Sequence, residues 1–457
     1  MSIVMRNIFI PQRYKLIVDK IADTAKETGF DAYIVGGFVR DLLIKRDPKD
    51  LDIMMVSNKS NDKNKLIAGI IFSKFLTNKY KLHDPISFDK FGTSKVFINN
   101  EEIEFVIPRK ECYSKQSRNP CIQPASLEED ALRRDFTINT LFLRLSDMRI
   151  LDLTSRGIDD IKNKIIRVNN VQSAEITFQQ DPLRILRAVR QSLQLNFTID
   201  SKTYTAMKAS VSRINIVSYE RIRDEMNKIL IEKKPSKAFN MMDEINILIK
   251  IFPELAALNT SKRCNHIENL FIKTMKILDK VENNLVLRVS SLLYNIEIYN
   301  QHRISNDFTN IKNILKRFTY SNHFEQKVVS IIQNSIRFIM YPSDWNDINV
   351  RKFVNECGME FNLIMKFLKA YSSIDEKYEK FIKLKMKIRY LKSKNMLYIK
   401  SEQLNGTEMI KIFNIPAGKW IKEAKNRLKT AYLEKPNMTK EEAVDIVKKM
   451  LINEHSN

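Results

Sequence analysis

Asp50 and Asp52 are the residues whose type and spacing point most directly to chemistry. They flank Leu51 in the apolar run "DLDIMM" (50–55), and residues two apart on a β-strand project from the same side. The two carboxylates would therefore lie side by side, where they repel each other unless a cation sits between them. Such oxygen ligands suit Mg²⁺, which completes its shell with water and substrate phosphates. A solvated edge strand is the simpler alternative.

A glycine pair stands shortly before these aspartates, although the chain has only nine glycines. Gly36 and Gly37 follow the β-run "AYIV" (32–35) and precede "FVRDLLI" (38–44), which has helical spacing. A strand–Gly-Gly–helix unit offers free backbone N–H groups to an anion, and Arg40 could add charge-assisted bonds to phosphate oxygens. A tight turn with a solvated arginine is the alternative. Together with the aspartate pair, the unit favours nucleotidyl transfer.

The elements that must position these residues change character near residue 170. Before it, short β-rich runs alternate with helical segments; from "FQQDPLRILRAVRQSLQL" (178–195) onward, a 3.6-residue periodicity dominates. The sequence therefore predicts an α/β head followed by a helical tail, with joints at "EKKPSK" (232–237), "FPEL" (252–255) and "YPSDWND" (341–347).

The composition indicates the class of partner. A chain of 457 residues is too long to form one compact core. Its 77 Lys and Arg and its 54 Asp and Glu give a net charge of +23. This excess favours a polyanion, with nucleic acid first, although an AT-rich genome also enriches lysine. Four cysteines without a CxxC pair, at positions 112, 121, 264 and 357, indicate free thiols in a reducing compartment. Because no signal-like core or long apolar stretch is evident, we expect a cytoplasmic protein without membrane association.

"GGFVRDLL…DLDI" (36–53) resembles the signature of the tRNA nucleotidyltransferase and bacterial poly(A) polymerase family, the class II branch of the polymerase-β-like nucleotidyltransferases. Four further family motifs follow in order: "RRDFTINTLF" (133–142), "DLTSRGIDDI" (152–161), "QDPLRILRAVR" (180–190) and "SYERIRDEM" (218–226). The resemblance implies an α+β protein, with a polymerase-β-like head built on a mixed sheet, then an all-helical body and tail. The implied domains are a catalytic head (1–168), a base-recognition neck (169–250), a degenerate HD-like body (251–345) and a basic tRNA-binding tail (346–457).

The resemblance also implies roles in the head. Gly36, Gly37 and Arg40 would hold the triphosphate, while Asp50 and Asp52 would carry Mg²⁺ for a two-metal displacement. Glu104, on a later β-run, is a candidate third catalytic acid or an exposed strand residue. In "RRDFTIN", the residues implied to contact the ribose and support its pocket are Arg134, Asp135 and Asn139.

The "QDPLRILRAVR" segment is expected to be a helix that selects the base. The candidate side chains recur at intervals of three along one side: Asp181, Arg184, Arg187 and Arg190. A solvated basic face is the alternative for the last two. Gln180 replaces the usual family glutamate and so loses a charge.

These features imply CCA addition to tRNA from CTP and ATP. Segment 108–132 occupies the place of the flexible loop of adenosine-adding enzymes, which argues against a CC-only enzyme. An A-adding enzyme or a poly(A) polymerase has the same chemistry, and a catalytically inactive RNA-binding protein is a remote alternative.

The tail carries two further expectations. At the metal-binding positions of an HD segment stand Lys273 and Tyr294-Asn295, which cannot replace imidazole and carboxylate ligands, so only His266 is left. Residues 376–400 contain nine basic and two acidic residues with interleaved aromatics. They could follow the phosphates of the tRNA acceptor and TΨC arm, or form a solvated helix face. No protein partner is implied.

Overall fold

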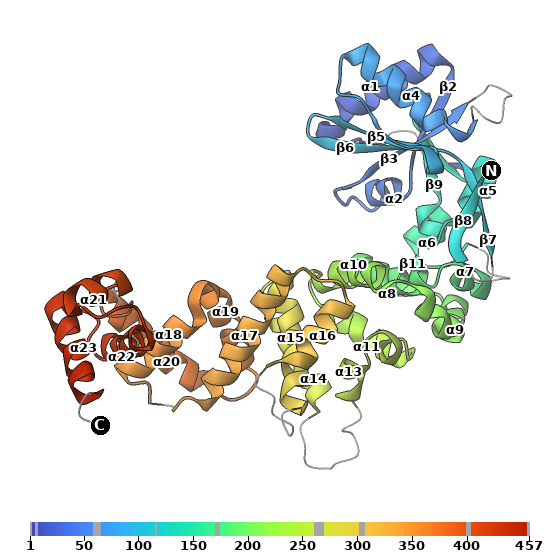
Figure 1. Cartoon of the computed structure of the whole chain (residues 1–457). Coiled ribbons are helices and arrows are strands. Elements are labelled where there is room, and N and C mark those ends of the chain that lie inside the picture. The colour runs from blue at the N-terminus through green and yellow to red at the C-terminus, as the bar shows by residue number, and fades with distance from the viewer. Residues whose placement is uncertain are drawn as a thin grey trace. The chain divides into compact units, whose positions relative to one another are not determined.

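The computed structural model describes residues 2–4, 8–57, 65–114, 117–169, 174–259, 269–300, 307–342, 344–398 and 404–454. The chain forms two compact units (Figure 1). The first comprises residues 1–229 and 237–253, and the second comprises residues 230–236 and 254–457.

An eight-stranded mixed sheet forms the head of the first unit. Its spatial order is β1 (Ser2–Val4), β10 (Arg149–Asp152), β9 (Leu141–Arg144), β2 (Phe30–Val35), β3 (Leu51–Ser57), β6 (Glu101–Val106), β5 (Thr93–Ile98) and β4 (Ile86–Phe88). Only the β3–β6 pair is parallel among the described neighbours of this sheet. The predicted mixed-sheet head is confirmed.

Helices cover both faces of this sheet. On one face, α4 (Ala68–Tyr80) brings the Phe72 ring to 5.3 Å from Phe105 of β6 and 5.8 Å from Phe30 of β2. Gly69 lets α4 approach closely, because a Cβ there would lie 2.9 Å from the Phe105 carbonyl oxygen. On the other face, Met54 and Phe142 pack with Ala131 of α5 (Leu127–Arg133). The polar residues of the candidate site lie on the face of the sheet that α5 covers, opposite to the face covered by α4.

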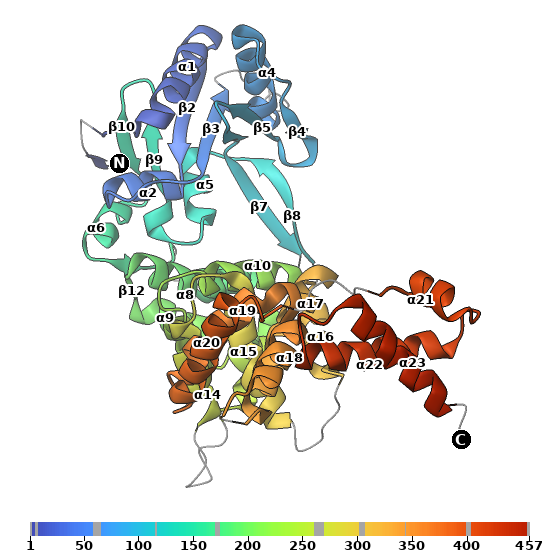
Figure 2. The ribbon, with the colours of Figure 1, turned by 90° about the vertical axis from the view of Figure 1, so that its left-hand side faces the viewer.

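Segment 108–132 is more regular than the flexible loop expected there. It contains an antiparallel ribbon of β7 (Arg109–Ser114) and β8 (Ser117–Pro124), followed by α5. Figure 2 shows this ribbon outside the main sheet. A capping box between Ser126 and Glu129 starts α5, so the local sequence specifies where the helix begins.

The helical part of the first unit begins with a departure from the expected single helix. Here α7 (Ala174–Gln180) ends before Asp181, and α8 (Leu183–Leu195) begins after Pro182. The α-conformation is sterically disfavoured for a residue that precedes proline, which explains the break at Asp181. The following elements are α9 (Ser201–Ser210), α10 (Tyr219–Leu230), α11 (Ser236–Glu244) and α12 (Leu248–Ile251). The next helix, α13 (Pro253–Ala257), lies mostly in the second unit.

The second unit consists of helices in its described part. They are α14 (Leu270–Lys280), α15 (Leu285–Asn300), α16 (Thr309–Arg317), α17 (Asn322–Met340), α18 (Asp347–Cys357), α19 (Phe361–Ser372), α20 (Tyr378–Ser393), α21 (Gly406–Phe413), α22 (Lys419–Glu434) and α23 (Lys440–Glu454). Buried Arg351 of α18 donates to the Met396 carbonyl at 2.8 Å and to carbonyls at the end of α22. It thereby joins the last helices to the others. Among the helices described, none is long and apolar enough to cross a membrane.

The HD-like positions hold a buried polar and aromatic cluster. Lys273 forms an ion pair with Asp375, and Lys377 lies 2.7 Å from the same carboxylate. Tyr294 packs its ring 5.0 Å from Tyr371, and Asn295 donates to Thr274 at 2.9 Å. The Lys273 ammonium is therefore neutralised by a carboxylate within this cluster. His266 and Cys264 lie outside the described residues, whereas Cys357 is a buried free thiol whose pKa burial raises to about 12.

Candidate active site

Asp52 and Glu104 lie opposite each other on neighbouring strands. The parallel β3–β6 register pairs Asp52 with Glu104, and the β5–β6 register pairs Lys95 with Glu104. Leu51 is buried while Asp52 is half-buried and Asp50, directly before β3, is exposed. Since Phe105 points to α4, Glu104 points to the opposite face. Three charged side chains thus cross one face of the sheet in a row.

The acidic group at this site holds more negative charge than its surroundings neutralise. Burial, Glu104 and Asp50 raise the pKa of Asp52 to about 6, although Arg134 and Lys95 act in the opposite direction. A divalent cation would relieve this repulsion, and carboxylate oxygens are suitable ligands for Mg²⁺. The described residues include no group of three or more His, Cys, Asp or Glu side chains that could hold a metal ion. Asp50 and Asp52 fit Mg²⁺ as a pair of carboxylate ligands, and water and substrate would supply the rest of its coordination shell.

The glycine pair brings the chain close to this acidic group. Gly36 has φ +75°, and a Cβ there would lie 3.4 Å from Arg134 Nη1 and 4.0 Å from Asp52 Oδ2. Gly36 therefore supplies both a left-handed conformation and room for a close approach. It precedes α2 (Gly37–Leu43). Arg134, at the end of α5, donates from Nε to Asp130 at 2.9 Å. Its guanidinium lies beside the Gly36 turn and near Asp52.

Arg40 has a different position from the one expected for a phosphate ligand. It is buried, its Nη2 lies 2.7 Å from Asp41, and its Nη1 donates to Asn139 at 2.7 Å. A Cβ at Gly37 would lie 3.2 Å from Arg40 Nη2. The guanidinium thus lies beneath the Gly-Gly turn with its donors engaged by protein groups. In this structure Arg40 supports the turn, and Arg134 is the arginine that reaches its surface.

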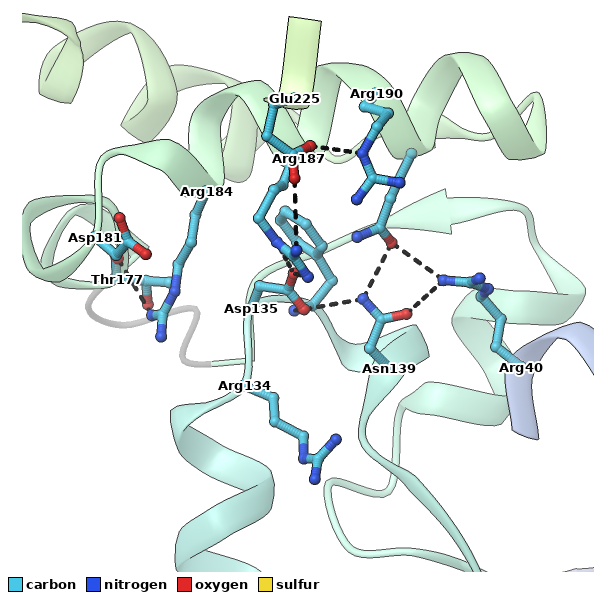
Figure 3. Close-up of polar contacts among 12 residues, drawn as sticks. Arg40, Arg134, Asp135, Asn139, Thr177, Asp181, Arg184, Arg187, Arg190 and Glu225 are labelled. Atoms are coloured by element: carbon cyan, nitrogen blue, oxygen red, sulfur yellow. Dashed lines mark hydrogen bonds and ion pairs between the residues drawn. The ribbon is translucent and has the colours of Figure 1, made fainter. Parts of the chain in front are cut away.

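A polar network connects the "RRDFTIN" segment to α8 and α10 (Figure 3). Asp135 accepts from Asn139 at 2.9 Å through one oxygen and from Arg187 Nε at 2.8 Å through the other. Burial opposes ionisation of Asp135, but Arg187 and Asn139 outweigh it and lower the pKa of the carboxyl. Asp135 is therefore a fixed anion at neutral pH. Arg190 donates to buried Glu225 of α10 at 2.6 Å.

Arg187 and Arg190 consequently do not form a solvated basic face, and their ion pairs with protein carboxylates leave them poorly placed to bind a base. Both bind carboxylates within the first unit, and Glu225 lies 3.8 Å from Arg187 Nη1. They hold α8 against the head segment and against α10.

Asp181 and Arg184 lie at the start of α8. Asp181 accepts from the Leu183 N–H at 3.2 Å and from Arg221 Nη2 at 3.0 Å. Arg184 is buried and donates to the carbonyl oxygens of Thr177, at 3.3 Å, and Arg133, at 2.7 Å. Figure 3 shows both side chains on the same side of α8 as Arg187. Asp181 lies in the turn before the helix rather than on it, and its carboxylate accepts from the first N–H of that helix.

Three further residues belong to the network but were not singled out from the sequence. Glu225 and Arg221 lie within "SYERIRDEM" (218–226), so the motif pointed to these residues but not to the side chains that they contact. Gln191 of α8 accepts from Asn139 and Arg40. Its signal was helical spacing alone, since it lies seven residues after Arg184 on the same face.

Two segments of the chain match known families. Residues 32–167 match the Poly A polymerase head domain, and residues 196–258 match the probable RNA and SrmB-binding site of polymerase A. Asp52, Glu104, Arg134 and Asp135 lie in the first segment and Glu225 in the second. The first helix that links them, α8, lies between the two matches.

Curated relatives match part of this chain. The chain is 33% identical to the CCA-adding enzyme of Lactobacillus helveticus over 249 residues, which cover 51% of this chain and 58% of that protein. It is 36% identical to the A-adding tRNA nucleotidyltransferase of Aquifex aeolicus over 183 residues, 40% of this chain and 20% of that one. The matched part is thus less than two thirds of either relative.

The fold extends over nearly the whole chain. The solved structure of the Bacillus stearothermophilus CCA-adding enzyme in complex with CTP aligns with 98% of this chain and 100% of that chain, with a TM-score of 0.69 and 21% identity. The likeness therefore includes the helices that the sequence matches do not reach.

Proposed function

We propose that this chain, which belongs to the class II tRNA nucleotidyltransferase and poly(A) polymerase family, adds C and A nucleotides to the 3′ end of tRNA from CTP and ATP. The observation that carries the proposal is the position of Asp52 beside the Gly36 turn and Arg134. A carboxylate pair, a closely approaching backbone and the partly exposed guanidinium of Arg134 are what a nucleoside triphosphate and its metal require. We place this activity in the cytoplasm, which stays a prediction.

The phosphates are assigned to the Gly-Gly turn. Backbone N–H groups at Gly36 and Gly37 and the guanidinium of Arg134 would hold the triphosphate oxygens. Bound Mg²⁺ supplies charge stabilisation to the attacking 3′-hydroxyl and the leaving pyrophosphate, and Asp50 and Asp52 are the residues that would hold it. Glu104 reinforces the negative potential beside Asp52. Arg40 acts from below by fixing the turn.

The ribose and the base are assigned to the next layer of residues. Asp135, an anion fixed by Arg187 and Asn139, would accept a hydrogen bond from a ribose hydroxyl. Asp181 would accept from the exocyclic amine of C or A, while Arg184 would donate to a neighbouring ring nitrogen. The two carbonyl contacts of Arg184 use two of the five N–H donors of its guanidinium. Arg187 and Arg190 hold these groups in place.

A narrower output is the second candidate function. The relative from Aquifex aeolicus is described as A-adding, and it is 36% identical over the part that matches. An A-adding enzyme or a poly(A) polymerase would use the same head and the same chemistry. A catalytically inactive RNA-binding protein is disfavoured by Asp52, because a site without a cation has no reason to hold repelling carboxylates together.

One assay separates these candidates. The protein is incubated with Mg²⁺ and with tRNA transcripts that end before C, after the first C, after CC and after CCA, with each nucleoside triphosphate supplied alone. CCA addition predicts CMP incorporation on the first two transcripts, AMP on the third and none on the last. AMP on the CC transcript alone identifies an A-adding enzyme, and long A tracts identify a poly(A) polymerase. No incorporation on any transcript contradicts nucleotidyl transfer.

The basic helix α20 and the residue after it are proposed as a tRNA contact, and two groups of basic side chains can be distinguished there. Lys383 and Lys387 form ion pairs with Glu379 at 2.9 Å and Asp347 at 2.7 Å. Arg389, Lys392 and Lys394 are exposed and have no ion-pair partner in the described part of the chain. Tyr390, 52% exposed, lies among them. The second group is therefore the one that RNA phosphates would meet.

Changing Arg389, Lys392 and Lys394 together to glutamine should weaken tRNA binding and flatten its salt dependence. Each lost phosphate contact removes roughly 0.7–0.9 from the slope of log affinity against log salt concentration. The control changes Lys79, Lys366 and Lys449 to glutamine, since each forms an ion pair within the chain and the loss of charge is equal. Equal slopes for the two triple variants in filter-binding titrations would show that α20 is a solvated face.

A further inference from the structure

Gln191 is a buried amide at the centre of the polar network. It lies on α8 and is 2% exposed. Its Oε1 accepts from Asn139 Nδ2 at 3.0 Å and from Arg40 Nη1 at 3.4 Å, while Arg40 Nη1 also donates to Asn139 Oδ1 at 2.7 Å. Three elements distant in sequence therefore meet at one amide oxygen. A buried polar group of this kind is costly unless paired.

The contacts around Asn139 fix the orientation of its amide. Its Nδ2 donates to Asp135 Oδ1 at 2.9 Å and to Gln191 Oε1, and its Oδ1 accepts from Arg40. If the amide were reversed, oxygen would face the Asp135 carboxylate and nitrogen would face the Arg40 guanidinium. Both new contacts would be repulsive. Gln191 supplies the second acceptor that holds Nδ2 on the Asp135 side.

Asp135 depends in turn on this amide. One of its oxygens accepts from Asn139 and from the Phe136 N–H, and the other binds Arg187. The position of the first oxygen follows the Asn139 amide. The hydrogen bonds of the Gln191 side chain are to Arg40 and Asn139, and not to Asp52, Asp181 or Arg184. Gln191 therefore acts on Asp135 through Asn139, and on Arg40, which lies beneath the Gly-Gly turn.

We propose that Gln191 is a positioning residue for ribose selection: it orients Asn139, and through Asn139 it holds Asp135 where a ribose 2′-hydroxyl can be recognised. The inference rests on the proposed function. Gln191 lies between the two segments that match known families, 32–167 and 196–258. A role in packing alone would affect every nucleotide equally, whereas the proposed role affects ribonucleotides more than deoxyribonucleotides.

The test compares kcat/KM for CTP and dCTP on a tRNA transcript that ends before C. Gln191→Met keeps the volume and removes the acceptor, so the CTP-to-dCTP ratio should fall by about tenfold, the size expected for a buried donor left without its partner. Gln191→Glu keeps an acceptor oxygen and should restore the ratio. Gln194→Met on the same helix removes an acceptor that lies 3.2 Å from Arg190 Nη1 and does not contact Asn139 or Asp135, so it should leave the ratio at the wild-type value.

The outcomes separate the inference from the proposed function. If wild-type protein adds CMP and Gln191→Met lowers both rates equally, the positioning role is wrong and the proposed function stands. If wild-type protein adds no nucleotide, the proposed function fails and the inference fails with it. Thermal unfolding is measured for each variant, and Gln191→Leu provides the same ratio should the methionine variant not fold. An unchanged ratio in either apolar variant overturns the proposal.

Discussion

Replacing Asp52 by asparagine should abolish nucleotide addition and, at the same time, stabilise the protein in the absence of metal. Asparagine preserves the shape but removes the charge that would hold the cation, and loss of several kcal/mol of transition-state stabilisation lowers the rate on the order of 10³-fold or more. Stability should rise because burial and the neighbouring Glu104 and Asp50 disfavour the ionised carboxyl. We expect a gain of roughly 1–2 kcal/mol at pH 7.5, after allowing for the partial solvent screening of a half-buried group.

The sign of the stability effect follows from the direction of the pKa change. The pKa of Asp52 is raised to about 6 in the folded protein, so the folded state holds this proton more tightly than the unfolded state. The penalty is therefore absent below about pH 4, develops between about pH 4 and 6, and is complete above pH 6. Thermal unfolding without metal should show Asp52→Asn more stable than wild type at pH 7.5, with the difference vanishing near pH 4.

Two controls make the Asp52 result specific. Asp147→Asn should reduce stability, because Arg144 lowers the pKa of the Asp147 carboxyl and the ion pair spans 2.6 Å. Adding Mg²⁺ should raise the unfolding temperature of wild type more than that of Asp52→Asn, since only wild type has both carboxylates. Substantial turnover in Asp52→Asn would contradict the catalytic assignment. A loss of stability at pH 7.5 would contradict the charge imbalance.

Local patterns were sufficient for features that depend on short-range geometry. The alternation in "DLDIMM" predicted that Leu51 would be buried between two carboxylates, and Leu51 is 1% exposed. The Gly-Gly signal predicted a special turn, and Gly36 has a left-handed φ. The change from β-runs to helical periodicity predicted that a head containing β-strands precedes a helical part, as the structure shows. Each of these signals lies within a few residues along the chain.

Partners distant in sequence were not predictable in the same way. Asp135 and Arg187 are 52 residues apart, and Lys273 and Asp375 are 102 apart. A motif shows that an arginine is present but not which carboxylate neutralises it. For this reason Arg187 and Arg190 could be read as solvated, and Arg40 could be read as a direct phosphate ligand. The structure assigns internal acceptors to all three.

The base-reading segment shows how local and distant information combine. Pro182 follows Asp181, so the rule on residues before proline would have placed Asp181 outside the helix. The partner of Asp181, Arg221, is 40 residues away on α10. The Arg221 guanidinium orients the Asp181 carboxylate by donating to one of its oxygens, while the Leu183 N–H donates to the other. Asp181 is thus held as a fixed acceptor at the start of α8.

Replacing Asp181 by alanine should raise misincorporation of UMP and GMP relative to CMP and AMP while lowering the overall rate. The exocyclic amine of C or A can donate to the carboxylate, whereas U and G turn a carbonyl oxygen toward it. An acceptor left unpaired and repelled costs roughly 1–3 kcal/mol, so discrimination should fall by about 10- to 100-fold. Single-nucleotide extension on transcripts that end before C and before A measures the four nucleotides at each step.

Arg221→Met provides the matched variant, because it keeps Asp181 but removes the side chain that orients it at 3.0 Å. If Asp181 reads the base as an oriented carboxylate, Arg221→Met should lose part of the same discrimination, and Arg184→Ala should instead lower the rates for both correct nucleotides. Glu220→Gln, a change of charge at the residue next to Arg221 on α10, should leave discrimination at the wild-type level. Wild-type selectivity at every step in the Asp181→Ala variant would show that the start of α8 does not read the base. Loss of selectivity in Asp181→Ala with none in Arg221→Met would show that the carboxylate acts without the α10 arginine, since the Leu183 N–H alone would then suffice to hold it.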